Sequence, residues 1–237
     1  DPDHLEAVAR ALDVHHHIET VLVTAFEIGL MRYDESGWSF TERDYETELR
    51  QESQESGRWA LIHRACADLV PEEGSHGMPA SERRFVHLDL AGFDEEAVVQ
   101  LAAALEDHLF QSSYPRAGAI ADDLERRLAT LGAAPDDARR IRAATARLDV
   151  LRFTGRLEDA IEASHGMEQR VATCSDPFAR ADALRAMANI KYLAGDSEAA
   201  SALSGRAFSF AAGNDLLLAK LNHGTAWYLS NGPKARA

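Results

Sequence analysis

A short pattern centred on glycine occurs three times in this chain of 237 residues. Residues 90–98 read LAGFDEEAV, residues 153–161 read FTGRLEDAI, and residues 193–201 read LAGDSEAAS. Gly allows the left-handed conformation that ends a helix, and the acidic residue that follows suits the first turn of the next helix. The Ala five places after Gly lets two helix backbones approach closely. The pattern therefore predicts two antiparallel helices joined by a tight turn.

The spacing of these turns predicts a repeating array of helix pairs. Gly92, Gly155, Gly195 and a later Gly232 are separated by 63, 40 and 37 residues. The segment SSYPRA at 112–117 fits the missing turn, with Ser in the Gly position and Ala in the Ala position. Because each pair can bury its apolar stripe only against its neighbours, the expected product is an α-solenoid. The helices are expected at 82–91, 94–110, 114–131, 136–153, 157–172, 178–193, 197–212 and 215–230, with Asp136, Asp176 and Asp196 as N-caps.

Residues 1–72 show a different order of elements. Two stretches with helical periodicity come first, and LMRYDESGWSF at 30–40 follows, with two aromatic runs around Asp-Glu-Ser-Gly that predict a hairpin. Helical periodicity then returns. Helix, helix, hairpin and helix is the order of a winged-helix domain. Residues 73–81 are rich in Gly, Ser and Pro and are expected to be a linker, which leaves 82–237 for the helical repeats.

Composition and charge exclude several classes of function. No apolar run approaches the roughly 18–20 residues that span a bilayer, and we see no signal peptide, so a cytoplasmic location is expected. Cys66 and Cys174 lack CxxC spacing and are expected to be reduced thiols. The net charge is −14, and residues 1–72 carry 16 acidic residues against six Arg and no Lys. Such a surface repels nucleic acid and anionic membranes. The chain starts at Asp1 without Met, and we expect it to be a piece of a longer protein.

The helical repeats resemble tetratricopeptide (TPR) repeats of the longer variety. The resemblance covers residues 82–237 and rests on Gly, an acidic residue and Ala at fixed offsets with periods of about 35–43 residues. The usual Trp and the late Pro of that family are mostly missing. The expected fold class is therefore mainly α, with a small winged-helix-like domain followed by a TPR-like α-solenoid of antiparallel helix hairpins.

The first 72 residues resemble the winged helix that follows the nucleotide-binding module in STAND signalling ATPases, which include the LuxR-type large ATP-binding regulators. The matching residues are Gly29-Leu30, Trp38-Ser39-Phe40 and His63. Glu42 departs from the pattern, because the family often has His at that place. The resemblance implies a non-catalytic regulatory or sensor segment of a larger bacterial ATPase, with its ATP site upstream. The alternative is a stand-alone TPR scaffold for protein–protein interaction.

Partner binding by such a solenoid is expected on its concave face, which the first helix of each pair lines. Arg185 and Asn189 resemble the Lys-x-x-x-Asn pair with which some TPR proteins hold the terminal carboxylate of a peptide. We expect Arg185→Glu or Asn189→Ala to weaken binding of a protein or peptide effector, or of a second copy of the chain, without unfolding the array. Counting back from the turn glycines assigns these residues to the face: Arg142, Thr145, Asp149, Arg152, Asp182, Arg185, Asn189, Tyr192, Asn222 and His223.

No motif of an enzyme was found. The phosphate-binding GxxxxGK[ST] and GxGxxG patterns are absent, and so are GxSxG and HExxH. We therefore expect no catalytic residue, no cofactor, no metal and no direct contact with nucleic acid. A third hypothesis makes the cluster His15, His16 and His17 the metal site of an enzyme. Consecutive residues of a helix point about 100° apart, which disfavours a shared ion.

Overall fold

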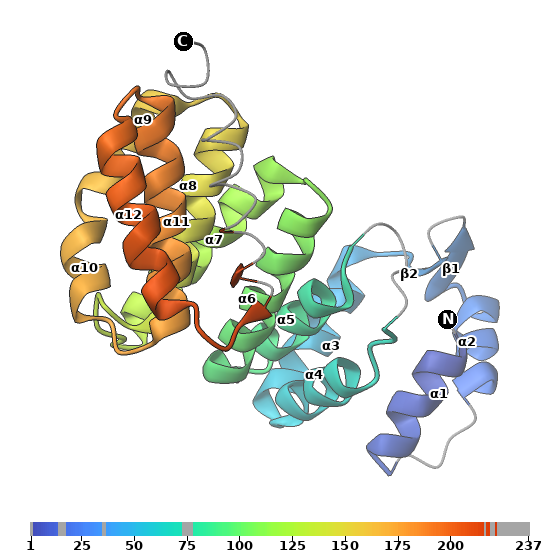
Figure 1. The fold of residues 1–237 in the computed structure, drawn as a ribbon. Helices are drawn as coiled ribbons and strands as arrows, with labels where there is room; N and C mark the ends of the chain where they lie inside the picture. Colours follow the sequence, from blue (N-terminus) through green and yellow to red (C-terminus); the bar gives the residue numbers. More distant parts are fainter. Residues whose placement is uncertain are drawn as a thin grey trace. The chain divides into compact units, whose positions relative to one another are not determined.

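The computed structural model describes residues 2–13, 18–34, 37–72, 78–215, 217, 218 and 221 (Figure 1). Within them the chain is mainly α-helical, with twelve helices and one two-stranded sheet, which confirms the expected class. Contacts between Cα atoms divide the chain into two units, Asp1–Gln100 and Leu101–Ala237. The division falls inside α6 (Asp94–Phe110). No helix among the described residues has the length and apolar character to cross a membrane.

The first unit begins with helix, helix, hairpin and helix, in the order expected from the sequence. Its elements are α1 (Pro2–Ala11), α2 (Ile18–Glu27), β1 (Met31–Asp34), β2 (Gly37–Phe40), α3 (Arg43–Glu55), α4 (Arg58–Asp68) and α5 (Ala80–Leu90). The two strands are antiparallel, with Met31 opposite Phe40 and Arg32 opposite Ser39. The hairpin predicted from the aromatic runs at 30–40 is therefore confirmed.

The base of the hairpin is joined to the end of α2. Gly29 has a φ of +77°, and the Leu30 amide donates to the Ala25 carbonyl at 2.8 Å, which satisfies a carbonyl of the last helical turn. Thr41, directly after β2, donates from its hydroxyl to the Gly29 carbonyl at 2.7 Å and from its amide to the Leu30 carbonyl at 3.0 Å. Residues at both ends of the hairpin thus meet at one turn.

Helices α4 and α5 pack against each other within the first unit. Ala67, Leu88 and Ala97 form a small buried cluster, and Arg64 donates to the carboxylate of Glu96 at 2.5 Å. Contacts place α5 in this unit, although its sequence pattern groups it with the later helices. Residues 73–77 of the expected linker 73–81 lie outside the described residues, so the linker stays a prediction there, while residues 80 and 81 belong to α5.

Two histidines meet where α4 and α5 pack. The Nδ1 atoms of His63 and His87 lie 2.9 Å apart, and the His63 ring packs edge-on against Trp59 with 4.3 Å between centroids. The indole N–H of Trp59 donates to the Leu90 carbonyl at 2.9 Å. Burial, followed by the positive charge of Arg50, lowers the pKa of His63 below its usual 6.5.

The second unit is built from antiparallel helices that pack on their sequence neighbours. After the last part of α6 come α7 (Tyr114–Thr130), α8 (Ala138–Phe153), α9 (Leu157–His165), α10 (Met167–Thr173), α11 (Pro177–Leu193) and α12 (Ser197–Phe210). Helices α7, α8, α11 and α12 lie side by side in that order (Figure 1). A core that α8, α11 and α12 share includes Leu148, Leu184, Met187 and Ile190, each at most 2% exposed.

The repeated glycine pattern forms the same turn each time. Gly92, Gly155 and Gly195 have φ angles of +77°, +77° and +87°, and no atom of the described residues lies within 4 Å of a Cβ built on any of them. The left-handed backbone, and not a lack of space, therefore requires glycine there. Ser112, which the sequence places in the same position of the fourth turn, has a φ of +58°. This residue adopts a conformation that costs a non-glycine residue roughly 1–2 kcal/mol.

A single residue links the two helices at each of these turns. Arg156, which follows Gly155, donates from its amide to the Leu151 carbonyl at 2.9 Å, and its own carbonyl accepts from the Ala160 amide at 3.1 Å. It therefore closes α8 and starts α9. The pattern alanines are buried, as a close approach of two helices predicts; they are Ala97, Ala117, Ala160 and Ala200. The turns at Gly92 and Ser112 differ from the others in having a single helix, α6, between them.

Two details of the expected helices are wrong. The helix expected at 157–172 breaks at Gly166 into α9 and α10. Gly166 has a φ of −83°, so it does not adopt the left-handed conformation of the turn glycines. The break follows from the low helix propensity of Gly, together with the burial of Met167, the first residue of α10. The N-cap of α8 is Asp137 and not Asp136, because the Asp137 carboxylate accepts from the Arg139 amide at 2.8 Å.

The other two expected N-caps are confirmed. Asp176 accepts from two amides at the start of α11, and Asp196 accepts from the Ala199 amide at the start of α12. The expected helix 215–230, the turn at Gly232 and the cluster His15, His16 and His17 lie wholly or mostly outside the described residues.

Candidate functional site

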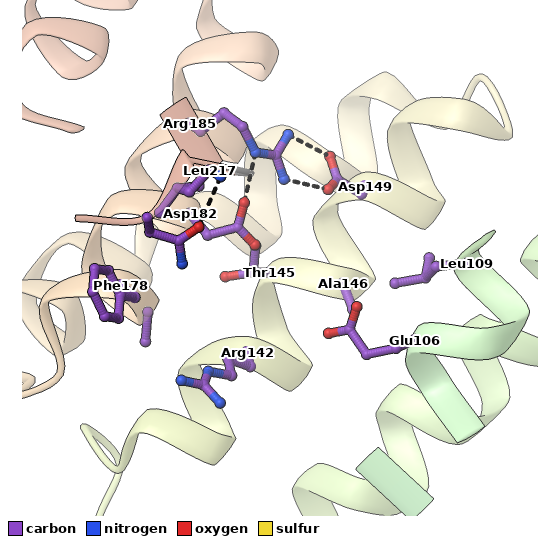
Figure 2. Close-up of a pocket in the computed structure, with 12 residues that line it drawn as sticks. Glu106, Leu109, Arg142, Thr145, Ala146, Asp149, Phe178, Asp182, Arg185 and Leu217 are labelled. Carbon is purple, nitrogen blue, oxygen red and sulfur yellow. Dashed lines mark hydrogen bonds and ion pairs between the residues drawn. The ribbon is translucent and has the colours of Figure 1, made fainter. Parts of the chain in front are cut away.

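A pocket with a volume of about 210 Å³ lies in the second unit, on one side of α6, α8 and α11 (Figure 2). These are the first helices of three successive pairs, whose turns are at Ser112, Gly155 and Gly195. The pocket is lined by Glu106 and Leu109 from α6; Arg142, Thr145, Ala146 and Asp149 from α8; Phe178, Ala179, Asp182 and Arg185 from α11; and Asn214 and Leu217, which follow α12.

The pocket brings together part of the predicted face. Of the eight predicted residues that the structure describes, five line it: Arg142, Thr145, Asp149, Asp182 and Arg185. Arg152, Asn189 and Tyr192 are described but do not line it. Asn222 and His223 lie outside the described residues.

Arg185 is the most strongly held charge of the pocket. Its Nη2 donates to Asp149 Oδ2 at 2.6 Å, its Nη1 to Asp149 Oδ1 at 3.4 Å, and its Nε to Asp182 Oδ1 at 2.7 Å. The Arg185 side chain is 11% exposed and that of Asp149 is 15% exposed. Burial alone lowers the pKa of Arg185, but the charges of Asp149 and Asp182 outweigh burial and raise this pKa above its usual value.

These contacts change the interpretation of Arg185. Because its guanidinium already binds two carboxylates, Arg185 joins α8 to α11 and is not poised to receive the carboxylate of a peptide. Its expected companion Asn189 is half-buried elsewhere on α11. Substituting Arg185 by Glu would place three carboxylates together, so we no longer expect that variant to leave the fold unchanged.

Thr145 and Arg152 also serve the packing of the helices. Thr145 is 2% exposed, and its hydroxyl donates to the Ile141 carbonyl one turn earlier at 2.8 Å, as buried helical Thr commonly does. The Arg152 guanidinium lies 3.8 Å from the ring centroid of Phe153, and its Nη2 donates to Asp149 at 3.3 Å. Phe153 in turn stacks on Tyr114 of α7.

Arg142 lies on the exposed rim of the pocket. Its side chain is 54% exposed, and its Nη2 pairs with Asp176, the N-cap of α11, at 2.9 Å. Exposed pairs of this kind contribute roughly 0–1 kcal/mol to stability. The pair thus leaves Arg142 able to exchange partners at little cost.

Glu106 was missed by the sequence analysis. Its side chain is exposed. Among the ionisable residues that line the pocket, Glu106 is the one for which the described part of the chain provides no hydrogen bond or ion pair. Glu106 and Leu109 stand six and three residues before Ser112, as Asp149 and Arg152 stand before Gly155. Applying to Ser112 the count that was applied to the glycines would have found them.

The other missed residues reflect how the pocket crosses the helices. On α6 the lining residues lie three to six places before the turn, on α8 six to thirteen places, and on α11 ten to seventeen places. The pocket therefore runs obliquely, from the end of α6 to the start of α11. Phe178 and Ala179 were missed because a constant count assumes a straight path. Leu109 and Ala146 form an apolar wall beside Glu106, and Phe178 and Leu217 add apolar surface elsewhere in the lining (Figure 2).

Comparisons with protein-family models, with curated proteins and with solved structures gave no match. Among the described residues, no group of three or more His, Cys, Asp or Glu side chains is placed to hold a metal ion. The pocket on α6, α8 and α11 is the candidate site, and its lining combines charged and apolar side chains.

Proposed function

We propose that this chain is the regulatory segment of a larger STAND-type signalling ATPase, a winged-helix-like block followed by a TPR-like sensor array. In this proposal the pocket on α6, α8 and α11 binds a protein or peptide effector. The observation that carries it is the position of the pocket on the first helices of successive pairs, the face that solenoids of this type use for binding.

The order of elements in the first unit supports the same proposal. Two helices, an antiparallel hairpin and further helices follow each other, as in the winged helix of the resembling family. The excess of acidic residues in 1–72 disfavours a role in reading DNA, which needs clustered Lys and Arg. A role in transmitting a signal between domains requires no such charge.

The pocket suggests how binding would be transmitted. Its lining residues come from three helix pairs, so an effector that fills it contacts all three pairs at once. Such an effector binds best to one arrangement of the pairs and shifts the population of the array toward it. The ion pair between Arg185 and Asp149 couples α8 to α11 in that arrangement. The winged-helix-like block would pass the change to the ATPase module.

Photo-cross-linking in the source cells tests the binding role. Replacing Phe178 by p-benzoyl-phenylalanine keeps an aromatic ring in the wall of the pocket. Phe153, an exposed aromatic residue on α8 that does not line the pocket, is the matched control position. We expect a defined cross-linked protein from position 178 and not from position 153. Equal products from both positions, or none from position 178, would contradict the assignment of the pocket.

The size of the native gene product tests the larger architecture. An antibody raised against this chain is used in an immunoblot of the source cells. We expect a band several times larger than the 26.0 kDa of the chain. A band near 26.0 kDa would contradict the ATPase and favour the stand-alone scaffold.

A further inference from the structure

The charges that line the pocket are balanced except at one point. Asp149 and Asp182 share Arg185, Asp149 also receives Arg152, and Arg142 is paired with Asp176. Glu106 has no such partner in the described part of the chain. The lining residues therefore present one uncompensated carboxylate, at the α6 side of the pocket.

We infer that the effector binds through a basic side chain, Arg or Lys, whose charged end pairs with Glu106 while its aliphatic stem lies along the apolar wall. This inference rests on the proposed binding function of the pocket. Figure 2 shows Glu106 and Phe178 on opposite sides of the pocket, with Arg185 at a third side. A long side chain that enters between them meets Leu109 and Ala146 beside the carboxylate. Long basic side chains have this combination of apolar stem and charged end.

The size of the pocket agrees with a side chain and not with a larger ligand. Its volume of about 210 Å³ lies below the roughly 300–1,000 Å³ of pockets for drug-sized molecules. A bare divalent cation is disfavoured because Ca²⁺ needs 6–8 oxygen ligands, and the described residues leave a single lining carboxylate without a partner. An acidic anchor is disfavoured because Arg185 is already held by two carboxylates, and because an anchor on Arg142 would have to displace Asp176.

The charge of the whole chain points to a basic partner and not to a second copy. The chain has a formal net charge of −14, so two copies repel each other, whereas a basic segment is attracted over a distance of about a Debye length. The effector is therefore a separate protein or peptide with an exposed Arg or Lys.

The experiment uses four N-acetylated tripeptide amides with central Arg, Lys, Glu or norleucine, added to the ¹⁵N-labelled full chain. Backbone amide shifts of Glu106, Ala146 and Asp182 are followed by NMR. We expect saturable shifts with the Arg and Lys peptides, and about two- to fivefold weaker binding of both to the Glu106→Gln variant, the loss that an exposed ion pair gives. Glu158→Gln, which removes an exposed carboxylate in the first turn of α9, is the control and is expected to bind like the parent chain.

The outcomes separate this inference from the function on which it rests. If the Arg peptide binds the Glu106→Gln variant as tightly as the parent, or if the Glu peptide binds as well as the Arg peptide, the basic anchor is wrong. If only the norleucine peptide or the Glu peptide shifts the lining amides, the effector does not bind through a basic side chain, but the pocket is still a binding site. If no peptide shifts these amides, the basic anchor is again wrong, and the cross-linking from position 178 decides on the pocket itself.

Discussion

Arg185 on α11 and Asp149 on α8 stand 36 residues apart in the sequence and form a two-contact ion pair with both side chains at least 85% buried. The pair joins the first helices of two successive helix pairs. Either charge alone in such a place would destabilise the fold, because it would lose its hydration in a low-dielectric interior without gaining a partner. The pair is therefore a structural link between neighbouring pairs as well as a wall of the pocket.

Removing the guanidinium from this pair is expected to destabilise the second unit strongly. Arg185→Met leaves Asp149 and Asp182 close together without their shared cation, and we expect a loss of about 3–5 kcal/mol in the free energy of unfolding. In the double variant with Asp149→Leu, part of that loss should be recovered, with a coupling of roughly 1–3 kcal/mol. Urea denaturation followed by circular dichroism measures both.

Arg142→Met is the matched control for that comparison. Arg142 also pairs with an Asp across two helices, but its side chain is 54% exposed. We expect its loss to cost less than about 1 kcal/mol. Similar losses for Arg142→Met and Arg185→Met would show that burial does not set the strength of the Arg185 pair.

The left-handed turn residues predict a pair of opposite effects. Ser112→Gly relieves a non-glycine residue at a φ of +58°, and we expect stabilisation by about 0.5–1 kcal/mol. Gly195→Ser creates the same strain at a φ of +87°, and we expect destabilisation by about 1 kcal/mol. Within the described part of the chain no atom lies within 4 Å of a Cβ at position 195, so no clash with these residues adds to this figure. Thermal unfolding of both variants checks the signs, and effects of the same sign would rule out backbone strain as the cause.

The pattern alanines predict sensitivity to added volume. Ala160 is fully buried where α9 packs on α8, and Ala160→Leu is expected to destabilise the second unit by roughly 1–3 kcal/mol. Ala129→Leu, at an exposed position of α7, is the control and should change stability by less than about 0.5 kcal/mol. If Leu is tolerated equally at both positions, the close approach of the helices does not explain the recurrence of Ala.

The sequence predicted those features of the fold that depend on one backbone conformation. The turns at Gly155 and Gly195, and that at Ser112, follow from a left-handed residue and its neighbours, so local pattern was enough. The break at Gly166 was not predicted, because this glycine has an ordinary helical φ and the break depends on the burial of Met167. Tertiary packing decided that boundary.

The candidate site was predicted in part for a similar reason. Counting from the turns found Asp149 and Asp182, because residues at fixed offsets share a helix face. It could not show that both bind Arg185, since this contact depends on how α8 and α11 pack across 36 residues of sequence. Nor could it find Phe178, because the oblique course of the pocket is set by helix crossing and not by local sequence.

The contact between His63 and His87 predicts a pH dependence in the first unit. With their Nδ1 atoms 2.9 Å apart, one imidazole donates and the other must accept, which requires a deprotonated Nδ1. Burial, and then the charge of Arg50, lowers the pKa of His63 in the folded chain below its unfolded value of about 6.5. The unfolded chain therefore binds a proton more readily, so stability is fully present above about pH 6.5 and is lost as pH falls through the folded pKa.

An NMR titration of the full chain between pH 7.5 and pH 5 checks this dependence. We expect the His63 imidazole to titrate with a pKa below its ordinary value of 6.5, and exchange of the α4 amides to accelerate as His63 becomes protonated. In the His63→Gln variant the acceleration should be reduced, while His165→Gln should retain it. A His63 pKa at or above 6.5 would contradict the burial of a neutral imidazole between α4 and α5.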